Sequence, residues 1–292
     1  MKHYFYAAGA ILCWASLPVA TGSGLRELST EELMFFSFVS AAIYLYLQDI
    51  VLTRTFSLYI PGLKASLFGV SGIFLYHYTY YKALSYAPLA EGAILATTWS
   101  FWIVFFSSLL IFKRLKFSIV VTAAVGMSGA ALVIAAGKEV SFSLEYMKGY
   151  LLALLCGLIW SSFSVGLRYV KVNREPMTIF TIYAALLSTL LYVVTLPHTM
   201  PSFGSLAAAI YLGCVPLGLS FFLWNRAVTG GNMVIIGFLS YLTPPLAVLL
   251  VALIHGKAVS SQVLVGMVVI IGASIAGRVL LSRSQKREQA VE

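Results

Sequence analysis

Aromatic and ionisable side chains stand together inside some of the most apolar parts of this 292-residue sequence. Residues 76–82 read Tyr-His-Tyr-Thr-Tyr-Tyr-Lys, and on a helix Tyr76 and Tyr80 share one face while His77 lies on the next. Such a face could stack against a planar ring and hydrogen-bond its polar groups. Lys82 could bind a carboxylate through a charge-assisted hydrogen bond. The alternative is an interfacial belt of aromatic residues, with Lys82 reaching toward water.

Tryptophan side chains stand near the middle of three apolar stretches. Trp99 lies about halfway along residues 88–112, and Trp14 and Trp160 occupy matching positions in two other stretches. An indole N–H at that depth needs a partner, which favours the wall of a cavity, with plain helix packing as the alternative. Ser240 could offer a hydroxyl to a bound molecule. The expected substrate-binding residues are Tyr76, His77, Tyr80, Trp99, Trp160, Ser240, Trp14 and Lys82.

Enzyme chemistry is poorly supported by the sequence. It contains no H-E-x-x-H, G-x-S-x-G or phosphate-loop motif, and its four histidines are scattered. No stretch carries a central pair of carboxylates for acid–base or two-metal chemistry. We therefore expect no catalytic residue, no metal and no cofactor. A membrane-embedded lipid-modifying enzyme stays an alternative, but it would need polar residues clustered at one interface.

The composition indicates an integral membrane protein. Hydrophobic residues make up 60% of the chain and charged residues 10%, and 41 residues are Phe, Tyr or Trp. A soluble domain is about 45–50% apolar and about 25% charged. A chain of this size cannot bury so much apolar surface in its own core. The lipid bilayer is thus an expected partner, and nucleic acid is not, in spite of the net charge of +9.

Ten continuous apolar stretches predict an all-α protein with ten transmembrane helices. Each stretch is about twice the length of a barrel strand and long enough to span a bilayer as a helix. The stretches are 4–24, 32–52, 62–82, 88–112, 117–137, 148–170, 176–196, 203–226, 232–254 and 260–281.

The distribution of Lys and Arg predicts the orientation of these helices. With ten spans, fourteen of these residues fall on one side of the membrane and five on the other. Since basic residues gather on the cytoplasmic side, both termini are expected there, with 283–292 as a basic cytoplasmic tail.

The two halves of the chain resemble each other weakly. Glu31 matches Glu175 and Lys82 matches Arg226 at an offset of 144, which becomes 143 after the fourth stretch. We therefore expect two repeats, 1–143 and 144–282, of five spans each. Because five is odd, the repeats would cross the membrane in opposite directions. Such inverted repeats are typical of secondary transporters, which bind substrate near the bilayer midplane.

Several short motifs add a family resemblance. They are Trp14-Ala15-Ser16 and its counterpart Trp160-Ser161-Ser162, Y-K-A-L-S-Y-A-P-L-A at 81–90, L-T-P-P-L at 242–246, and Gly266 with Gly272. With the 5+5 layout they resemble the drug/metabolite transporter superfamily, in its ten-span branch of EamA-type exporters. The aromatic-rich third and fourth stretches look most similar to bacterial aromatic amino acid exporters of the YddG type. This resemblance implies export of small metabolites, with aromatic or apolar amino acids as the expected substrates, by alternating access in a bacterial inner membrane.

The sequence also departs from the family pattern. Ser100 stands where the family usually has a proline, and Arg114 and Lys257 stand where a glutamate is common. No acidic residue lies in 4–24, which argues against cation antiport through a first-helix glutamate. Phosphorylated sugars, nucleotide sugars or drugs remain alternative substrates. Proton coupling and the oligomeric state, with a monomer as one option, stay open.

Overall fold

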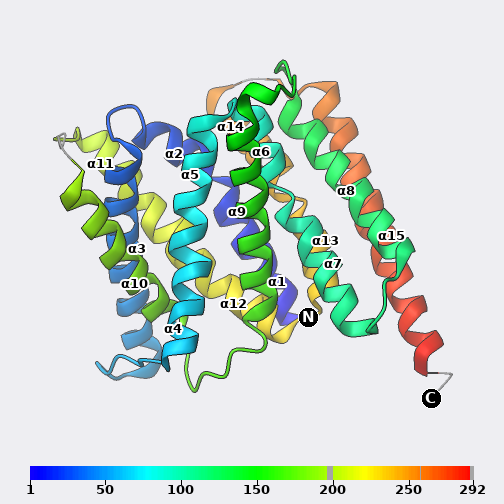
Figure 1. Ribbon diagram of the computed structural model, residues 1–292, viewed down its shortest axis with the longest axis horizontal. Coiled ribbons are helices and arrows are strands. Elements are labelled where there is room, and N and C mark those ends of the chain that lie inside the picture. Colours follow the sequence, from blue (N-terminus) through cyan, green and yellow to red (C-terminus); the bar gives the residue numbers. More distant parts are fainter. Residues whose placement is uncertain (196–199, 257, 290–292) are drawn as a thin grey trace. The chain divides into compact units, whose positions relative to one another are not determined.

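The computed structural model describes residues 1–195, 200–256 and 258–289, and this part of the chain is helical, without strands (Figure 1). His198, Lys257 and the last three residues of the predicted tail lie outside the described residues. Each predicted apolar stretch coincides, within several residues, with one helix or with consecutive helices.

The chain divides into two compact units, and each is built from two separate segments. Unit 1 comprises Met1–Tyr78 and Tyr169–Thr229, and unit 2 comprises Thr79–Arg168 and Gly230–Glu292. The boundaries differ from those of the expected repeats, because each unit takes segments from both halves of the sequence. They fall inside two helices, α5 (Tyr76–Tyr86) and α12 (Ser220–Gly230).

Unit 1 contains the first three predicted stretches, up to Tyr78, and the seventh and eighth. Its other helical segments are α1 (Lys2–Ala15), α2 (Leu17–Gly24), α3 (Thr30–Thr53), α4 (Leu63–Val70), η1 (Ser71–Leu75), α10 (Met177–Val194), α11 (Phe203–Leu212) and η3 (Gly213–Leu219). Helix α3 begins with a reciprocal cap: the Glu32 N–H donates to Ser29 Oγ (3.2 Å) and the Ser29 N–H donates to Glu32 Oε2 (2.8 Å). This cap satisfies two N–H groups that a helix start would leave open.

The helices of the second and seventh predicted stretches, α3 and α10, pack on each other in unit 1. Helix α3 packs along α10 and η3. Small residues allow the close approach: a Cβ on Gly213 would collide with the backbone carbonyl of Ser37, and one on Gly69 would collide with the Phe180 ring. Glycine at these positions is therefore required by helix crossing rather than by backbone conformation.

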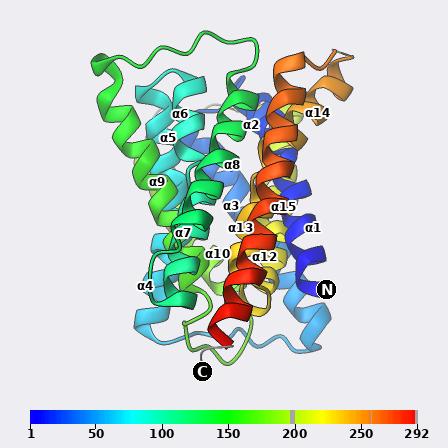
Figure 2. The same cartoon turned by 90° about the vertical axis from the view of Figure 1, so that its right-hand side faces the viewer.

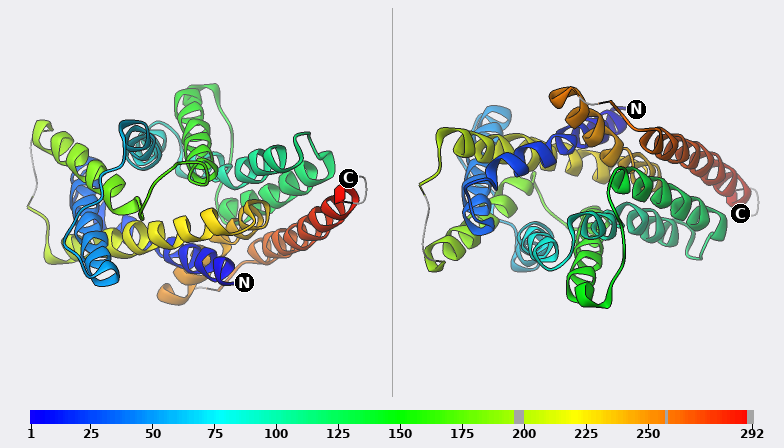
Figure 3. Two further views of the ribbon diagram at one scale, coloured as in Figure 1. Left: turned by 90° about the horizontal axis from the view of Figure 1, so that it is seen from below. Right: turned by 90° about the horizontal axis from the view of Figure 1, so that it is seen from above.

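Unit 2 contains the remaining stretches. Its helical segments, apart from the end of α5, are α6 (Leu89–Ala96), α7 (Trp99–Phe112), α8 (Phe117–Ala135), η2 (Leu144–Tyr146), α9 (Met147–Gly166), α13 (Met233–Ser240), α14 (Thr243–His255) and α15 (Ser261–Gln289). Helices α8 and α15 lie side by side along their length (Figures 2 and 3). Helix α15 continues past the predicted end at 281, because the Lys, Arg and Gln residues that follow are good helix formers.

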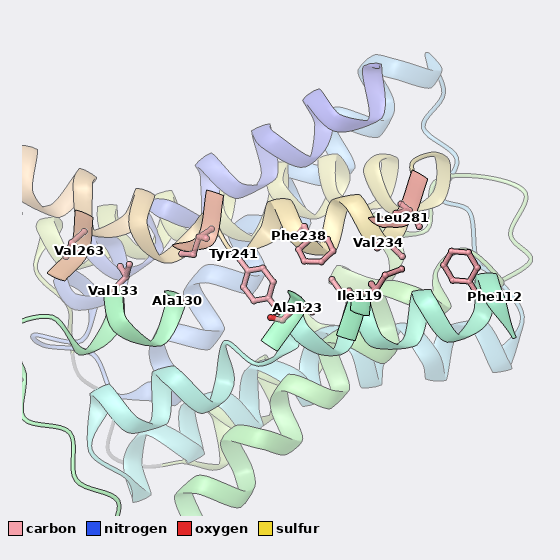
Figure 4. Close-up of a cluster of buried hydrophobic side chains, with 12 residues drawn as sticks. Phe112, Ile119, Ala123, Ala130, Val133, Val234, Phe238, Tyr241, Val263 and Leu281 are labelled. Atoms are coloured by element: carbon pink, nitrogen blue, oxygen red, sulfur yellow. Dashed lines mark hydrogen bonds between the residues drawn. The ribbon is translucent and has the colours of Figure 1, made fainter. Parts of the chain in front are cut away.

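The core of unit 2 lies where α8, α13 and α15 meet (Figure 4). Tyr241 points into it, and its hydroxyl donates to the carbonyl of Ala123 at 2.8 Å. Gly129 packs against Gly266, where a Cβ on Gly129 would lie 3.0 Å from the Gly266 carbonyl oxygen. The hydroxyl of the buried Tyr241 is thus hydrogen-bonded although the residues around it are apolar.

Nine helical runs among the described residues are long and apolar enough to cross a membrane. The run from Leu63 to Tyr86 is continuous but is not among them. Its second half, α5, carries the tyrosines, His77 and Lys82, which lower the mean hydropathy. Large apolar side chains stand exposed on the other runs, among them Val268 at 70% and Leu253 at 80%. Exposure on this scale fits contact with lipid and shows a multi-pass membrane protein.

The helices of matching stretches are interrupted at matching positions. π-helical turns occupy 71–75 in η1 and 213–219 in η3. Helices α6 and α7 are separated at Thr97–Thr98, and α13 and α14 are separated at Tyr241–Leu242, which lie 144 residues later. π-turns and broken helices leave backbone groups that other groups must satisfy, and they often mark functional sites.

Candidate functional site

The Trp14 side chain forms a hydrogen bond with the backbone of an interrupted helix in unit 1. Its indole N–H donates to the carbonyl of Pro216, 3.1 Å away inside η3. The Ser220 hydroxyl donates to the same carbonyl. The Trp14 ring also packs against Trp224, with 4.9 Å between ring centroids. The polar group of Trp14 is therefore engaged by the protein itself, which is a structural use for this predicted site residue.

His77 lies in a box of aromatic rings in unit 1. The rings of Tyr76, Phe38 and Phe221 stand edge-on to it, with centroids 4.8, 5.1 and 5.8 Å away. Its Nδ1 lies 2.7 Å from the carbonyl of Ile73, inside the π-turn η1. Because a carbonyl only accepts, Nδ1 carries the proton in this contact. The structure thus places the rings of Tyr76 and His77 in contact, although helix periodicity put them on neighbouring faces, and it ties the imidazole to the interrupted helix.

A carboxylate that the sequence did not single out lies at one end of unit 1. Glu175, before α10, accepts hydrogen bonds from the Asn225 side chain and from Arg226 Nε, the latter at 3.3 Å. Burial raises the pKa of the Glu175 carboxyl above its usual value, although the Arg226 charge and the Asn225 hydrogen bond oppose the shift. The charge of Arg226, the repeat counterpart of Lys82, is therefore balanced within the protein. The match of Glu31 with Glu175 was the available signal.

The break between α6 and α7 gathers several predicted residues in unit 2. Trp99 is the first residue of α7 after the break and is buried. Helix α9 presses Gly157 against this break, where a Cβ would lie 2.7 Å from Thr98 Oγ1 and 3.3 Å from the Trp99 nitrogen. Trp160 lies about one turn further along α9, buried, with its ring 5.6 Å from Phe163. Trp99 and Trp160 thus belong to helices that meet where α6 and α7 separate.

Ser240 closes a contact between two interrupted helices of unit 2. It ends α13 just before the second break, and its hydroxyl lies 2.8 Å from Ser100 Oγ and 2.7 Å from the Gly237 carbonyl. Both serines are completely buried. Ser100 matches Pro244 of the second half at the offset of 144, and its hydroxyl links the helices. No local pattern predicts this pair, because the partners are 140 residues apart.

Tyr80 and Lys82 belong to the part of α5 in unit 2. Tyr80 and Lys82 are half-buried, and Tyr80 packs on Tyr81 with ring centroids 5.6 Å apart. The eight predicted residues therefore divide between the units: Trp14, Tyr76 and His77 lie in unit 1, and Tyr80, Lys82, Trp99, Trp160 and Ser240 lie in unit 2.

Within the described residues, no three His, Cys, Asp or Glu side chains are grouped to hold a metal ion.

Glu91 is the buried carboxylate of unit 2. It lies in the first turn of α6 and is 3% exposed. Its Oε1 accepts the backbone N–H of Ser141 at 3.0 Å, and its Oε2 is buried without a hydrogen-bond partner among the described residues. Glu91 thereby holds the connection between α8 and α9 against α6.

Comparison with known proteins places this helical architecture among transporters. The "Aromatic amino acid exporter YddG" of Ancylobacter novellus is 33% identical over 217 residues, which are 74% of this chain and 76% of that protein. An "Uncharacterized transporter" of Archaeoglobus fulgidus is 24% identical over 83% of this chain and 86% of its own length. One solved crystal structure superposes with a TM-score of 0.86 at 29% identity, covering 96% of this chain and 98% of its own.

The sequence pattern of the EamA-like transporter family matches residues 1–135 and 147–276, which is most of the chain and both expected repeats. The pattern thus covers the interrupted helices of both units. The chain belongs to the EamA-like transporter family.

Proposed function

We propose that this protein exports aromatic amino acids by alternating access, and that it is not an enzyme. The observation that carries the proposal is the pair of buried tryptophans, Trp99 and Trp160, on helices that meet at the α6–α7 break. A broken helix exposes backbone dipoles to a ligand, and an indole offers a flat face for a substrate ring. The name of the Ancylobacter novellus relative supports the same substrate class.

In this proposal the polar end of the substrate is bound by Lys82. A charge-assisted hydrogen bond from its ammonium would hold the amino acid carboxylate. Tyr80, two residues earlier on α5, would line the same site. Within unit 1, Tyr76 and His77 are the proposed substrate contacts. Trp14 and Ser240 have hydrogen-bonding roles within the protein, so we assign them the weakest contributions to binding.

Transport of phosphorylated sugars or nucleotide sugars is the less supported alternative. Phosphate groups are usually held by several Lys or Arg side chains, and the Arg226 guanidinium already faces Glu175 at 3.3 Å. An amino acid carries a single carboxylate, so fewer basic side chains are needed to bind it. The geometry therefore favours a zwitterionic substrate.

We further propose ten membrane spans arranged as two inverted repeats, 1–143 and 144–282. The recurrence of the helix interruptions supports the repeat, and the continuous helix Leu63–Tyr86 would be the remaining span. The surplus of Lys and Arg on one side supports cytoplasmic termini in a bacterial inner (plasma) membrane, including the basic tail at 283–292.

The test is counterflow of labelled phenylalanine in proteoliposomes. We expect flux well above that of empty vesicles, with Trp99→Ala and Trp160→Ala losing most of it and Trp99→Phe retaining more. Absence of flux above empty vesicles would contradict the substrate class. Unchanged flux in Trp99→Ala would contradict the site.

A second comparison isolates the role of Lys82. Lys82→Gln should raise the KM for phenylalanine about tenfold or more, because a hydrogen bond between charged groups contributes about 1.5–3 kcal/mol. Inhibition by phenethylamine, which lacks the carboxylate, should change little. Equal loss of both ligands would show that Lys82 acts on the fold instead.

A further inference from the structure

Helices α8 and α15 run antiparallel in a register that the contacts define. Gly129 packs against Gly266, Gly126 packs near Ala273, and Gln262 Nε2 donates to the Leu132 carbonyl at 3.1 Å. Earlier residues of α8 therefore lie beside later residues of α15. Figure 4 shows the result, with Val133 near Val263 at one end, and Phe112 and Leu281 at the other.

This register gathers basic residues at the Phe112 end of unit 2. The loop between α7 and α8 supplies three of them and the last turns of α15 supply three more. We call this group the basic patch; it consists of Lys113, Arg114, Lys116, Arg278, Arg283 and Lys286. All except the half-buried Lys116 are exposed. The sequence contains no Asp or Glu in 99–136 or 256–287, and Glu288 in the last turn of α15 is the single acidic residue of α7, α8 and α15, so positive charge exceeds negative charge at this end.

Lys113 occupies a backbone conformation that disfavours it. It ends α7 with φ +51°, in the left-handed region. Gly256 lies 143 residues later, at the matching end of α14, with φ +62°. Glycine adopts this conformation without the steric conflict that a Cβ introduces. Lys113 thus stands where the matching helix end in the second half carries glycine, so Lys113→Gly removes the charge without straining the backbone.

Exposed apolar side chains border the basic patch. Leu115 is 60% exposed and Phe117 is 79% exposed, both beside the basic loop, and Val279 is 43% exposed on α15. The basic patch and the apolar side chains beside it are complementary to a phospholipid, because its phosphate is negative and its acyl chains are apolar.

We propose that the basic patch binds the headgroup phosphate of an anionic phospholipid, with the acyl chains lying along α8 and α15. The opposing charges select anionic over zwitterionic headgroups. Lys and Arg near a membrane surface contribute additively to such binding, at about fivefold in affinity per charge.

The experiment titrates the full-length protein in detergent with phosphatidylglycerol or phosphatidylcholine and counts retained lipids by native mass spectrometry. The test variant combines Lys113→Gly, Arg283→Gln and Lys286→Gln. The matched control is Lys138→Gln with Lys148→Gln, which removes positive charge from the opposite end of the same unit. We expect the test variant to bind phosphatidylglycerol about 100-fold more weakly, with the control close to wild type and phosphatidylcholine unaffected.

Folding is checked separately with Lys113→Gly alone. This variant should have a Tm equal to or above that of wild type and bind phosphatidylglycerol about fivefold more weakly. Equal phosphatidylglycerol binding by the test and control variants would overturn the proposal. Displacement of the lipid by millimolar inorganic phosphate would also overturn it, because the site would then recognise a small anion. Loss of the bound lipid when two copies of the protein form a dimer would likewise overturn it, because the patch would then be a contact between two protein chains.

Discussion

The indole N–H of Trp14 and the carbonyl of Pro216 form a hydrogen bond across 202 residues of sequence, at 3.1 Å. It joins the first helix of unit 1 to a π-turn in the eighth predicted stretch. Pro216 lies inside the π-turn η3, and the carbonyls of such an irregular turn accept hydrogen bonds from donors outside the helix. A tryptophan that invites a substrate-binding interpretation thus has a clear structural role.

Trp14→Phe should lower the stability of the protein while leaving substrate affinity unchanged. The substitution keeps an aromatic ring beside Trp224 but removes the donor to Pro216, which keeps only the Ser220 hydroxyl. We expect a loss of about 1–2 kcal/mol in the free energy of unfolding, measured by thermal unfolding in detergent. A large rise in the KM for phenylalanine with unchanged stability would show that Trp14 contacts substrate instead.

Ser100 and Ser240 should be coupled energetically. Each lies in the core of unit 2 with its hydroxyl 2.8 Å from the other. Ser100→Ala and Ser240→Ala should each destabilise the protein, and the double variant should be less destabilised than the sum predicts, by about 0.5–1.5 kcal/mol. A double-mutant cycle of unfolding free energies measures this. Strict additivity would refute the pairing.

Gly69 should not tolerate a larger residue while Phe180 stands opposite. A Cβ at 69 would collide with the Phe180 ring, so Gly69→Ala should cost about 1–3 kcal/mol of stability. Phe180→Leu, which withdraws the ring, should restore part of that loss in the double variant. Gly62→Ala is the control, because nothing lies within 4 Å of a Cβ at that position. Equal Tm values for the two alanine variants would rule out the steric explanation.

Glu175 and Glu27 should give opposite pH dependences of stability. Burial raises the pKa of Glu175, so the folded state holds that proton more tightly than the unfolded state. The stability that this proton adds to the folded state is present in full below the ordinary pKa of 4.5. It is lost as the pH rises through the raised pKa of Glu175. Glu175→Gln should therefore match wild type near pH 4 and exceed it in Tm near pH 7.

Glu27 provides the control of opposite sign. Hydrogen bonds from Ser202, one of them from its N–H at 2.8 Å, hold the pKa of Glu27 below its usual value. Its contribution is present above the ordinary pKa and is lost as the pH falls through the lowered one. Glu27→Gln should thus lower the Tm slightly at neutral pH, with the gap closing in acid. Parallel responses of the two variants would contradict the assigned environments.

Helix positions were predictable from the sequence because long apolar runs leave few alternatives to membrane helices. Helix α3, at Thr30–Thr53, lies close to the predicted stretch 32–52, and a reciprocal cap that begins at Ser29 marks its start. The break at 241–242 has a signal in the sequence, since Pro244 and Pro245 follow it in the first turn of α14 and proline is favoured at a helix start. The break at 97–98 has no such signal, because apolar residues continue on both sides of it. Hydropathy records where a helix crosses the membrane and is insensitive to where it bends.

The sequence suggests candidate site residues, but it does not show which of them meet in space. The rings of Tyr76 and His77 meet edge to face, although helix periodicity puts neighbouring residues on different faces. The partners of Trp14 and Ser240 are far away in sequence, and no local rule relates such residues. Likewise, Arg226 resembled a ligand-binding cation by its match with Lys82, whereas the structure shows Glu175 beside it.

The discontinuous construction of the two units has a consequence for biosynthesis. Unit 1 is complete only when Thr229 has been made, and unit 2 needs Gly230 and the residues that follow. The first 168 residues to leave the ribosome therefore complete neither unit, and their helices must wait in the membrane for partners. Helices such as α3 and α8, which find α10 and α15 only later, depend in that interval on lipid or on the insertion machinery to cover their packing faces.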